Sequence, residues 1–270
     1  MAVWGPDAPP REALLSYAVA PPRALRWYDV FLLPLGAFVF TVLAGGAALL
    51  ADRYIFRTGF DIWGTWAPDF EAAWFIYTVE IALYAGFILT GVALLALRGH
   101  RLPSAYFPRI RLRHALAASG MGVVFALSFM LALSMLPAET QQQLMEQSDL
   151  LSPSSGGEAL MLAVVAVLLA PMAEELYFRG VLFRLLSARL PFVWSGGVTA
   201  LLFSLVHGHL FMLPGLGGWV LTAMLFAVGF VLAGFARATG SLRAPAIMHG
   251  AYNAVLLGPS VLFAFTGVPA

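Results

Sequence analysis

Residues 159–180 read ALMLAVVAVLLAPMAEELYFRG, an apolar run that leads directly into two adjacent glutamates and an arginine. An ionised side chain at the centre of a membrane helix costs roughly 2.5–3.5 kcal/mol on insertion scales, so a chain that keeps three of them there is expected to use them. On a helix, Glu175 and Arg179 are four residues apart and share a face, where they can pair. Glu174 is rotated by about 100° from Glu175. The stretch therefore predicts a membrane helix in which Glu174 is free to face another group.

The composition of the whole chain agrees with a membrane protein. Of the 270 residues, 61% are hydrophobic and only 11% are charged, whereas globular domains carry about 25% charged residues. The chain has no cysteine, which excludes disulfides, iron–sulfur clusters and thiolate zinc sites. A net charge of +1 gives no reason to expect nucleic-acid binding.

Apolar stretches of about 18–25 residues are long enough to cross a bilayer. Seven occur, near residues 31–51, 74–97, 115–136, 159–178, 192–212, 217–236 and 245–265. We therefore expect an all-α fold: a polytopic transmembrane helical bundle of about 7–8 helices, with the polar site on the C-terminal helices. Residues 1–30 are expected to form a cytoplasmic N-terminal segment and residues 31–270 the membrane domain. The segment Arg179–Leu190 is shorter and amphipathic, which predicts an interfacial helix.

The distribution of arginine predicts the orientation. The loop 98–114 holds five arginines and no acid, and is therefore expected in the cytoplasm. The loop 137–158 holds four acids and no basic residue, which suits the opposite side. Counting spans from these loops places the N-terminus, the Arg179–Arg189 segment and the Arg237–Arg243 loop in the cytoplasm. Trp63, Trp66 and Trp74 are expected to form an aromatic belt at the outer interface.

Further polar groups interrupt the apolar second half of the chain. Residues 203–209 read FSLVHGH, and residues 249–253 read HGAYN, which places His249 and Asn253 on one helical face. Histidines and carboxylates on separate membrane helices suggest one shared site. One interpretation is a divalent metal such as zinc, held by Glu174, His207 and His249, that activates water. The other is a desolvated glutamate that acts as a general base without metal. The zinc-protease signature HExxH is absent, which weakens the metal interpretation.

Three motifs occur in one order: EExxxR (Glu174, Glu175, Arg179), FxxxH (Phe203, His207) and HxxxN (His249, Asn253). In this order they resemble the CPBP family of intramembrane proteases, also called the CAAX prenyl protease, bacteriocin-processing or Abi family. The resemblance covers about residues 155–258.

The resemblance implies an intramembrane endopeptidase that cuts a membrane-associated protein or peptide, of the CAAX type or of the bacteriocin or signal-peptide type. By position, Glu174 resembles the general base and His207 its partner in orienting water. His249 and Asn253 resemble the pair that stabilises the oxyanion. Glu175 and Arg179 resemble a supporting ion pair. No cofactor is required on this interpretation, and zinc is the alternative that stays open.

The implied partners are the lipid bilayer and a membrane protein or peptide substrate, prenylated or not, and the implied location is the inner membrane of a bacterium with the active site open to the cytoplasm. Two other classes of function stay open. One is a non-catalytic membrane immunity or scaffold protein of the same fold, and the other is a transporter with a proton relay, which fits less well because the polar residues concentrate in the last four spans. The sequence assigns no role to Glu80 or His209 and does not give the oligomeric state.

Overall fold

The computed structural model describes residues 25–60, 64–70, 72–100, 105–149, 153–213 and 215–266. In these ranges the chain is helical, and its extended backbone amounts to an isolated bridge between Phe60 and Trp66. The expected all-α class is confirmed. The expected segment 1–30 lies mostly outside the described residues, as do Trp63 and Arg101 of the expected aromatic belt and arginine-rich loop.

The helices in chain order are α2 (Asp29–Ala51), continued by the π-helical η1 (Asp52–Phe56), α3 (Ala73–Leu97), α5 (Leu112–Ser134), α6 (Ala138–Asp149), the composite helix described next, α10 (Phe192–Val206), α11 (His209–Met212), α12 (Leu216–Thr239) and α13 (Arg243–Thr266). The composite helix comprises α7 (Gly156–Val164), η2 (Val165–Leu169), α8 (Ala170–Glu175), η3 (Leu176–Leu182) and α9 (Phe183–Ser187). We call this continuous stretch, Gly156–Ser187, the site helix.

Six helices in the described part of the chain are long and apolar enough to cross a membrane. The seventh expected span, 192–212, is shorter than predicted, because α10 has 15 residues and at 1.5 Å per residue reaches about 22 Å, less than the roughly 30 Å hydrocarbon core. The helix ends because Gly208 adopts a left-handed conformation with φ of 77°, a common way to terminate a helix.

The prediction of a separate interfacial helix over Arg179–Leu190 is wrong. The site helix continues through this region to Ser187, and Arg179 is fully buried. The apparent amphipathic pattern arose because Arg179 and Arg184 have partners inside the protein: Arg184 donates to the Ala105 carbonyl and lies over the Tyr106 ring. The helix ends shortly before Pro191, as expected for residues that precede proline.

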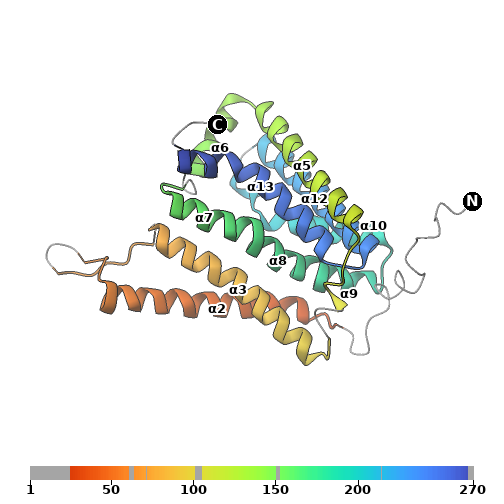
Figure 1. Cartoon of the computed structure of the whole chain (residues 1–270), viewed down its shortest axis with the longest axis horizontal. Coiled ribbons are helices and arrows are strands. Elements are labelled where there is room, and N and C mark those ends of the chain that lie inside the picture. The colour runs from red at the N-terminus through yellow and green to blue at the C-terminus, as the bar shows by residue number, and fades with distance from the viewer. Residues whose placement is uncertain are drawn as a thin grey trace, which may run out of the picture.

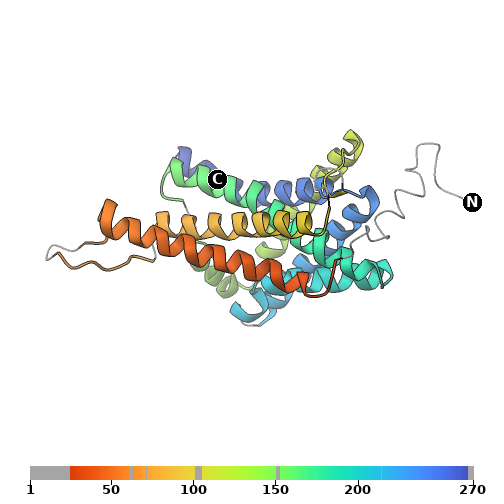
Figure 2. The same cartoon turned by 90° about the horizontal axis from the view of Figure 1, so that it is seen from below.

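The helices form a hairpin and a larger bundle with the site helix between them (Figure 1). α2 and α3 pack along each other, and the two views agree on this arrangement (Figures 1 and 2). α13 packs against α5, and α10 packs against α12. The site helix contacts α3 on the hairpin side and α13 on the bundle side, so its residues can meet side chains from both halves of the chain.

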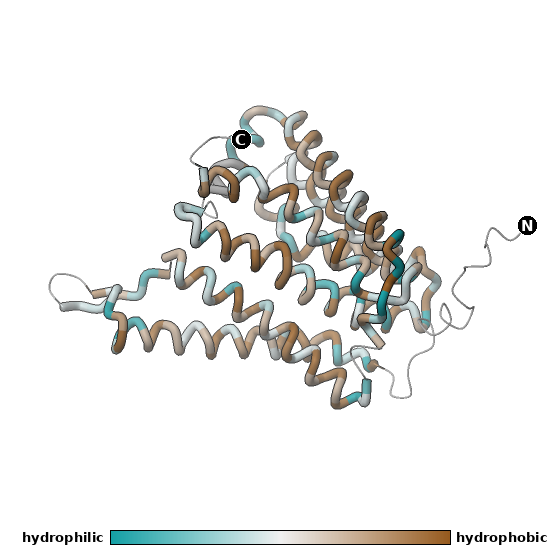
Figure 3. Tube along the Cα trace, viewed as in Figure 1, coloured by the Kyte–Doolittle hydropathy of each residue, from teal (hydrophilic) through white to brown (hydrophobic). Residues whose placement is uncertain are grey.

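One end of the bundle gathers the arginine-rich segments. Residues 105–108 dock there through backbone atoms: Leu242 donates its N–H to the Tyr106 carbonyl, and Arg243 donates to the Phe107 carbonyl. At the other end of the site helix, the Ser155 side chain caps the first turn by accepting the N–H of Glu158, and the Glu158 carboxylate accepts two bonds from Ser154. The expected acidic loop 137–158 contains the helix α6, whose polar character appears as teal near the C-terminal end of the molecule in Figure 3. Which end faces the cytoplasm stays a prediction.

Candidate active site

The site helix changes its winding twice around the glutamates. The π-helical segments η2 and η3 lie on either side of α8, which ends at Glu175. Such wide turns inside α-helices recur at functional sites, because they shift the direction of the following side chains and disturb the backbone hydrogen bonds. In this chain they flank the α-helical turn that carries Glu174 and Glu175.

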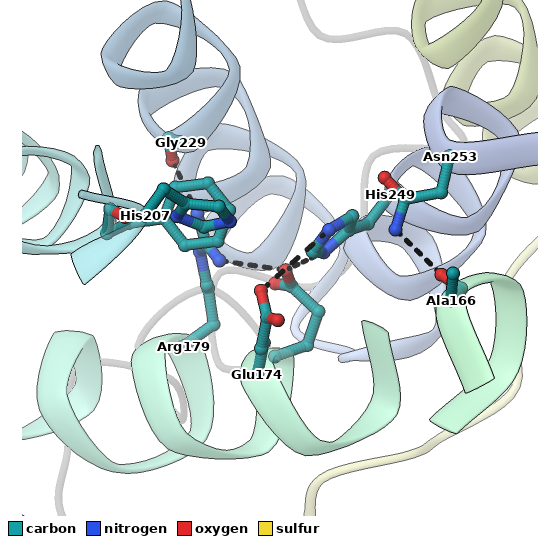
Figure 4. Close-up of polar contacts among 9 residues, drawn as sticks. Ala166, Glu174, Arg179, His207, Gly229, His249 and Asn253 are labelled. Atoms are coloured by element: carbon teal, nitrogen blue, oxygen red, sulfur yellow. Dashed lines mark hydrogen bonds and ion pairs between the residues drawn. The ribbon is translucent and has the colours of Figure 1, made fainter. Parts of the chain in front are cut away.

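A buried ionic network forms the base of the site (Figure 4). Arg179 Nη1 donates to Glu175 Oε1 at 2.8 Å, and both side chains are fully buried. Arg179 Nη2 donates to the carbonyl of Gly229 in α12 at 2.9 Å. The same Glu175 oxygen lies 3.1 Å from His249 Nδ1 in α13. Buried charges are tolerated when they are paired and hydrogen-bonded, so this network both satisfies the arginine and joins three helices.

Glu174 differs from its neighbour in exposure and in contacts. Its side chain is 20% exposed, and its Oε2 atom lies 3.9 Å from His249 Nε2. That oxygen is shielded from solvent and accepts no hydrogen bond from any residue that the structure describes. Glu174 thus stands beside the network with an unsatisfied carboxylate oxygen facing an imidazole nitrogen, a separation that one bridging water can span.

Phe203 lies at the centre of the aromatic contacts around the site. Its ring centroid is 4.7 Å from that of His207 and 5.7 Å from that of His249. The Arg179 guanidinium lies over the same ring at 4.6 Å, a cation–π contact that further stabilises the buried charge. The phenylalanine of the FxxxH motif therefore packs against the arginine and both histidines.

His207 is the last residue before the left-handed Gly208 and lies at the C-terminal end of α10. Its Nδ1 is 2.7 Å from the Phe203 carbonyl. Since a carbonyl only accepts hydrogen bonds, Nδ1 carries the proton and Nε2 is left for other partners. In the view of Figure 4, Glu174 projects between His207 and His249. The contact with Glu174 within hydrogen-bonding or ionic range comes from His249, whereas the resemblance implied His207 in that position.

Asn253 lies one turn after His249 on α13, as its spacing predicted. Its Nδ2 donates to the carbonyl of Ala166 in η2 at 2.7 Å. In Figure 4 this bond lies beside the glutamates and ties α13 to the site helix. The structure thus brings Glu174, Glu175, Arg179 and His249 into direct contact, with Asn253 and His207 on the two flanks.

Sequence reasoning missed two backbone groups at the site, and it named Phe203 without its contacts. The carbonyls of Gly229 and Ala166 accept bonds from Arg179 and Asn253, and backbone acceptors leave no mark in a sequence pattern. The only sequence signal for Ala166 was Pro171 inside an otherwise continuous helix. Phe203 was part of a motif, but nothing in the spacing showed that it would contact residues of three helices.

Glu174, His207 and His249 are the candidate ligands of the alternative metal site. Within the described ranges, no three side chains of His, Asp or Glu are placed so that they could hold a metal ion together. Glu174 and His249 approach each other. The Phe203 carbonyl holds Nδ1 of His207 and leaves Nε2 available, but the three side chains are not placed so that they could share one ion. The placement of these donors therefore does not fit a zinc site.

Glu80 and His209 lie near the site without joining the network. Glu80 is half-buried on the face of α3 that continues, seven residues later, to Phe87, whose ring contacts Tyr177 of the site helix. His207 and His209 do not share a helix, because Gly208 interrupts it with a left-handed conformation. The two rings are roughly parallel with centroids 6.5 Å apart.

Comparison with known proteins gives a match over the segment that holds these groups. Residues 156–255 match the family model described as type II CAAX prenyl endopeptidase Rce1-like. Residues 156–255 are an Rce1-like segment. This confirms the resemblance inferred from the three motifs, since the Rce1-like segment contains all six predicted site residues. No curated protein and no solved structure matches the chain. The matched family is a protease family, and the six apolar helices in the described part of the chain make the protein an integral membrane protein.

Proposed function

We propose that this protein is an intramembrane endopeptidase that hydrolyses a peptide bond of a membrane-associated protein or peptide, with Glu174 as the general base. The observation that carries the proposal is the pairing of an unsatisfied, partly exposed Glu174 carboxylate with His249, 3.9 Å away. The fully buried Glu175 and Arg179 beneath them give the pair a rigid support.

In the proposed reaction, one water lies between Glu174 Oε2 and His249 Nε2. Glu175 accepts the Nδ1 proton of His249, which leaves the Nε2 lone pair to hold one hydrogen of the water. Glu174 takes the other proton as the water oxygen attacks the peptide carbonyl carbon. The proton then passes from Glu174 to the amide nitrogen as the C–N bond breaks. A carboxylic acid and an amine leave, and the acid gives up its remaining proton to the amine or to water after release.

His207 is proposed to act on the developing oxyanion. The Phe203 carbonyl fixes its Nδ1 and leaves Nε2 for the site. In the protonated form this nitrogen is a charged donor, which suits a tetrahedral intermediate. This division exchanges the roles that the family resemblance implies for His207 and His249. We expect His249→Ala to slow hydrolysis more than His207→Ala does, and equal losses would leave the exchange unsupported.

The direct test uses purified protein in lipid vesicles with two fluorogenic peptides, one carrying a farnesylated C-terminal CAAX sequence and one with the same sequence unmodified. Glu174→Gln keeps the size of the side chain and removes the base, so we expect a loss of roughly 10²–10⁴-fold in kcat. Glu158→Gln, at the far end of the same helix, is the matched control and should retain activity. A folded Glu174→Gln variant that cleaves at the wild-type rate would falsify the mechanism.

The choice between the glutamate mechanism and zinc-dependent hydrolysis needs its own experiment. The protein is analysed for bound metal and assayed after dialysis against a strong chelator. We expect the activity to persist without metal, because the described residues do not form a three-donor set. Activity that disappears on chelation and returns with zinc supports the metal-dependent alternative.

The substrate is proposed to reach the site from the membrane and to be cut near the arginine-rich end, which we assign to the cytoplasm of a bacterial cell. Comparison of the two peptides reports whether a prenyl group is required. A non-catalytic immunity or scaffold role is distinguished by complementation: Glu174→Gln and His249→Ala should abolish an enzymatic phenotype and preserve one that depends on binding.

A further inference from the structure

The carbonyl of Ala166 has no hydrogen-bond donor at either of the two positions, residues 170 and 171, from which a helix normally supplies one. Its α-helical donor would be the N–H of Ala170, but that N–H bonds to the Val165 carbonyl in the wide η2 turn. Its π-helical donor would be residue 171, which is a proline and has no N–H. A carbonyl without a donor is costly in a membrane-spanning helix, even where it is only partly buried by protein, so Ala166 needs a partner from outside its helix.

Asn253 supplies that partner. Its Nδ2 donates to the Ala166 oxygen at 2.7 Å, a short bond for an amide donor. The bond fixes the orientation of the amide, because a flipped side chain would place two oxygens against each other. One N–H of Asn253 is thus committed to the site helix before any substrate binds.

A second contact one residue along holds the same two helices together. A Cβ added to Gly250 would lie 2.8 Å from the Val167 carbonyl oxygen. Because glycine has no Cβ, α13 can approach the site helix at this position more closely than a residue with a side chain would permit. Val167 is also the residue whose carbonyl would accept an α-helical bond from residue 171. The proline therefore disturbs two successive carbonyls, and α13 packs against both.

We propose that Pro171 is a positioning residue for the active site: it leaves the Ala166 carbonyl as the anchor of Asn253 and thereby sets the position of His249 along the site helix. Gly250 and Asn253 flank the site on α13, and His249 is adjacent to Gly250. A displacement of α13 by one residue, about 1.5 Å, would break both contacts. It would also move His249 away from Glu175, which now lies 3.1 Å from it.

The inference rests on the proposed function for its kinetic consequences. It assigns Asn253 first to the anchoring of α13, in addition to any donor that its second N–H provides to the substrate. An alanine at position 171 restores an N–H that can bond within the helix, so the Ala166 carbonyl no longer depends on Asn253.

The experiment combines kinetics with a measurement that needs no substrate. Pro171→Ala, Asn253→Ala and the double variant are assayed in vesicles, and ¹⁵N-histidine NMR spectra are recorded for each. We expect kcat to fall roughly tenfold in each single variant with KM within about twofold, since misplacement of a reacting group slows the chemical step. The kcat of the double variant should be no lower than that of the less active single variant, because both changes break the same contact. The His249 resonances should shift alike in both single variants.

Additive losses in the double variant, or a His249 signal unchanged by Pro171→Ala, would overturn the proposal. Pro34→Ala, which removes a proline within α2, is the matched control and should alter neither kinetics nor the His249 signal. If Pro171→Ala does not fold, Gly250→Ala tests the same contact from α13, because its methyl group displaces the Val167 carbonyl. If no peptide is cleaved, the proposed function fails, and the NMR spectra still decide the positioning role.

Discussion

Two buried carboxylates in this protein each pair with an arginine, and the two pairs have different consequences. Arg98 donates to Asp29 at 2.7 Å and connects the end of α3 to the start of α2, and the side chains are 18% and 0% exposed. Arg179 donates to Glu175 at 2.8 Å within one helix turn, and both side chains are fully buried. The first pair closes a hairpin at its end, and the second lies within a membrane-spanning helix.

The difference lies in what else contacts each carboxylate. Asp29 also accepts the backbone N–H of Arg26, a local bond three residues away. Glu175 shares its oxygen with His249, and Arg179 also donates to Gly229. The hairpin pair joins α2 to α3, whereas the site pair lies within one helix, reaches α13 and α12 through His249 and Gly229, and supports Glu174. A buried ion pair marks a functional site when its contacts extend to other polar groups that are not yet satisfied.

The comparison is tested most severely by Arg179→Leu. Loss of the guanidinium leaves Glu175 buried without its charge partner, and breaking a buried pair in this way costs about 3–5 kcal/mol. We expect a large fall in unfolding free energy and no detectable peptidase activity. Arg189→Leu, at an exposed position of the same arginine-rich region, is the control, and its stability should change by less than about 0.5 kcal/mol. The two changes are compared by thermal unfolding in detergent.

Glu175→Gln separates the supporting glutamate from the proposed base. The amide removes the charge opposite Arg179 and one acceptor for His249, and we expect a stability loss of about 1–3 kcal/mol together with reduced activity. Glu174→Gln should lose activity with little change in stability, because its carboxylate accepts no hydrogen bond from the described residues. The denaturation midpoints of the two variants are measured under the same conditions. Equal decreases in the two midpoints would contradict the proposed division of roles.

Asp29→Asn tests the hairpin pair. The amide keeps its shape and loses its charge, so we expect the bond to Arg98 to weaken and the protein to lose about 1 kcal/mol of stability. Activity should stay within about twofold, because neither residue contacts the site network. A loss of activity comparable to that of Glu175→Gln would show that the hairpin closure is coupled to the site.

Glu80→Gln is expected to have the smallest effect. This carboxylate is half-buried in α3 and forms no ion pair with any residue in the described ranges. Neutralising it should leave stability unchanged or slightly raised, since an ionised group in a membrane helix is unfavourable. Melting temperature and kcat/KM are the measurements. A tenfold loss in kcat/KM would place Glu80 among the groups that act on substrate.

Composition and local spacing were enough to predict much of the fold. The apolar runs predicted the helical membrane class, and six of the seven expected spans are long enough to cross. The pairing of Glu175 with Arg179 followed from their four-residue separation. These predictions worked because helix geometry and hydrophobic length depend on residues close in sequence.

Other features followed from contacts between distant residues and could not be predicted. The apparent interfacial helix after Arg179 is part of the site helix, because Gly229 and Phe203 satisfy the arginine from other helices. The length of α10 depended on the conformation of Gly208. The sequence did not show that His249 would contact Glu175 and approach Glu174, since 74 residues separate His249 from Glu175.

The sequence by itself determined that this is a helical membrane protein with carboxylates, histidines and an arginine at helical spacing, because those properties are local. Only the tertiary structure decided which of these groups is buried in the ionic network and which is open to the site. Glu174 and Glu175 are adjacent and chemically identical, and their burial and partners differ because α12 and α13 pack on one of them and leave the other partly open. The hydrogen bonds to the Ala166 and Gly229 carbonyls were also decided by the tertiary structure, since a carbonyl accepts such a bond only when folding brings a donor to it.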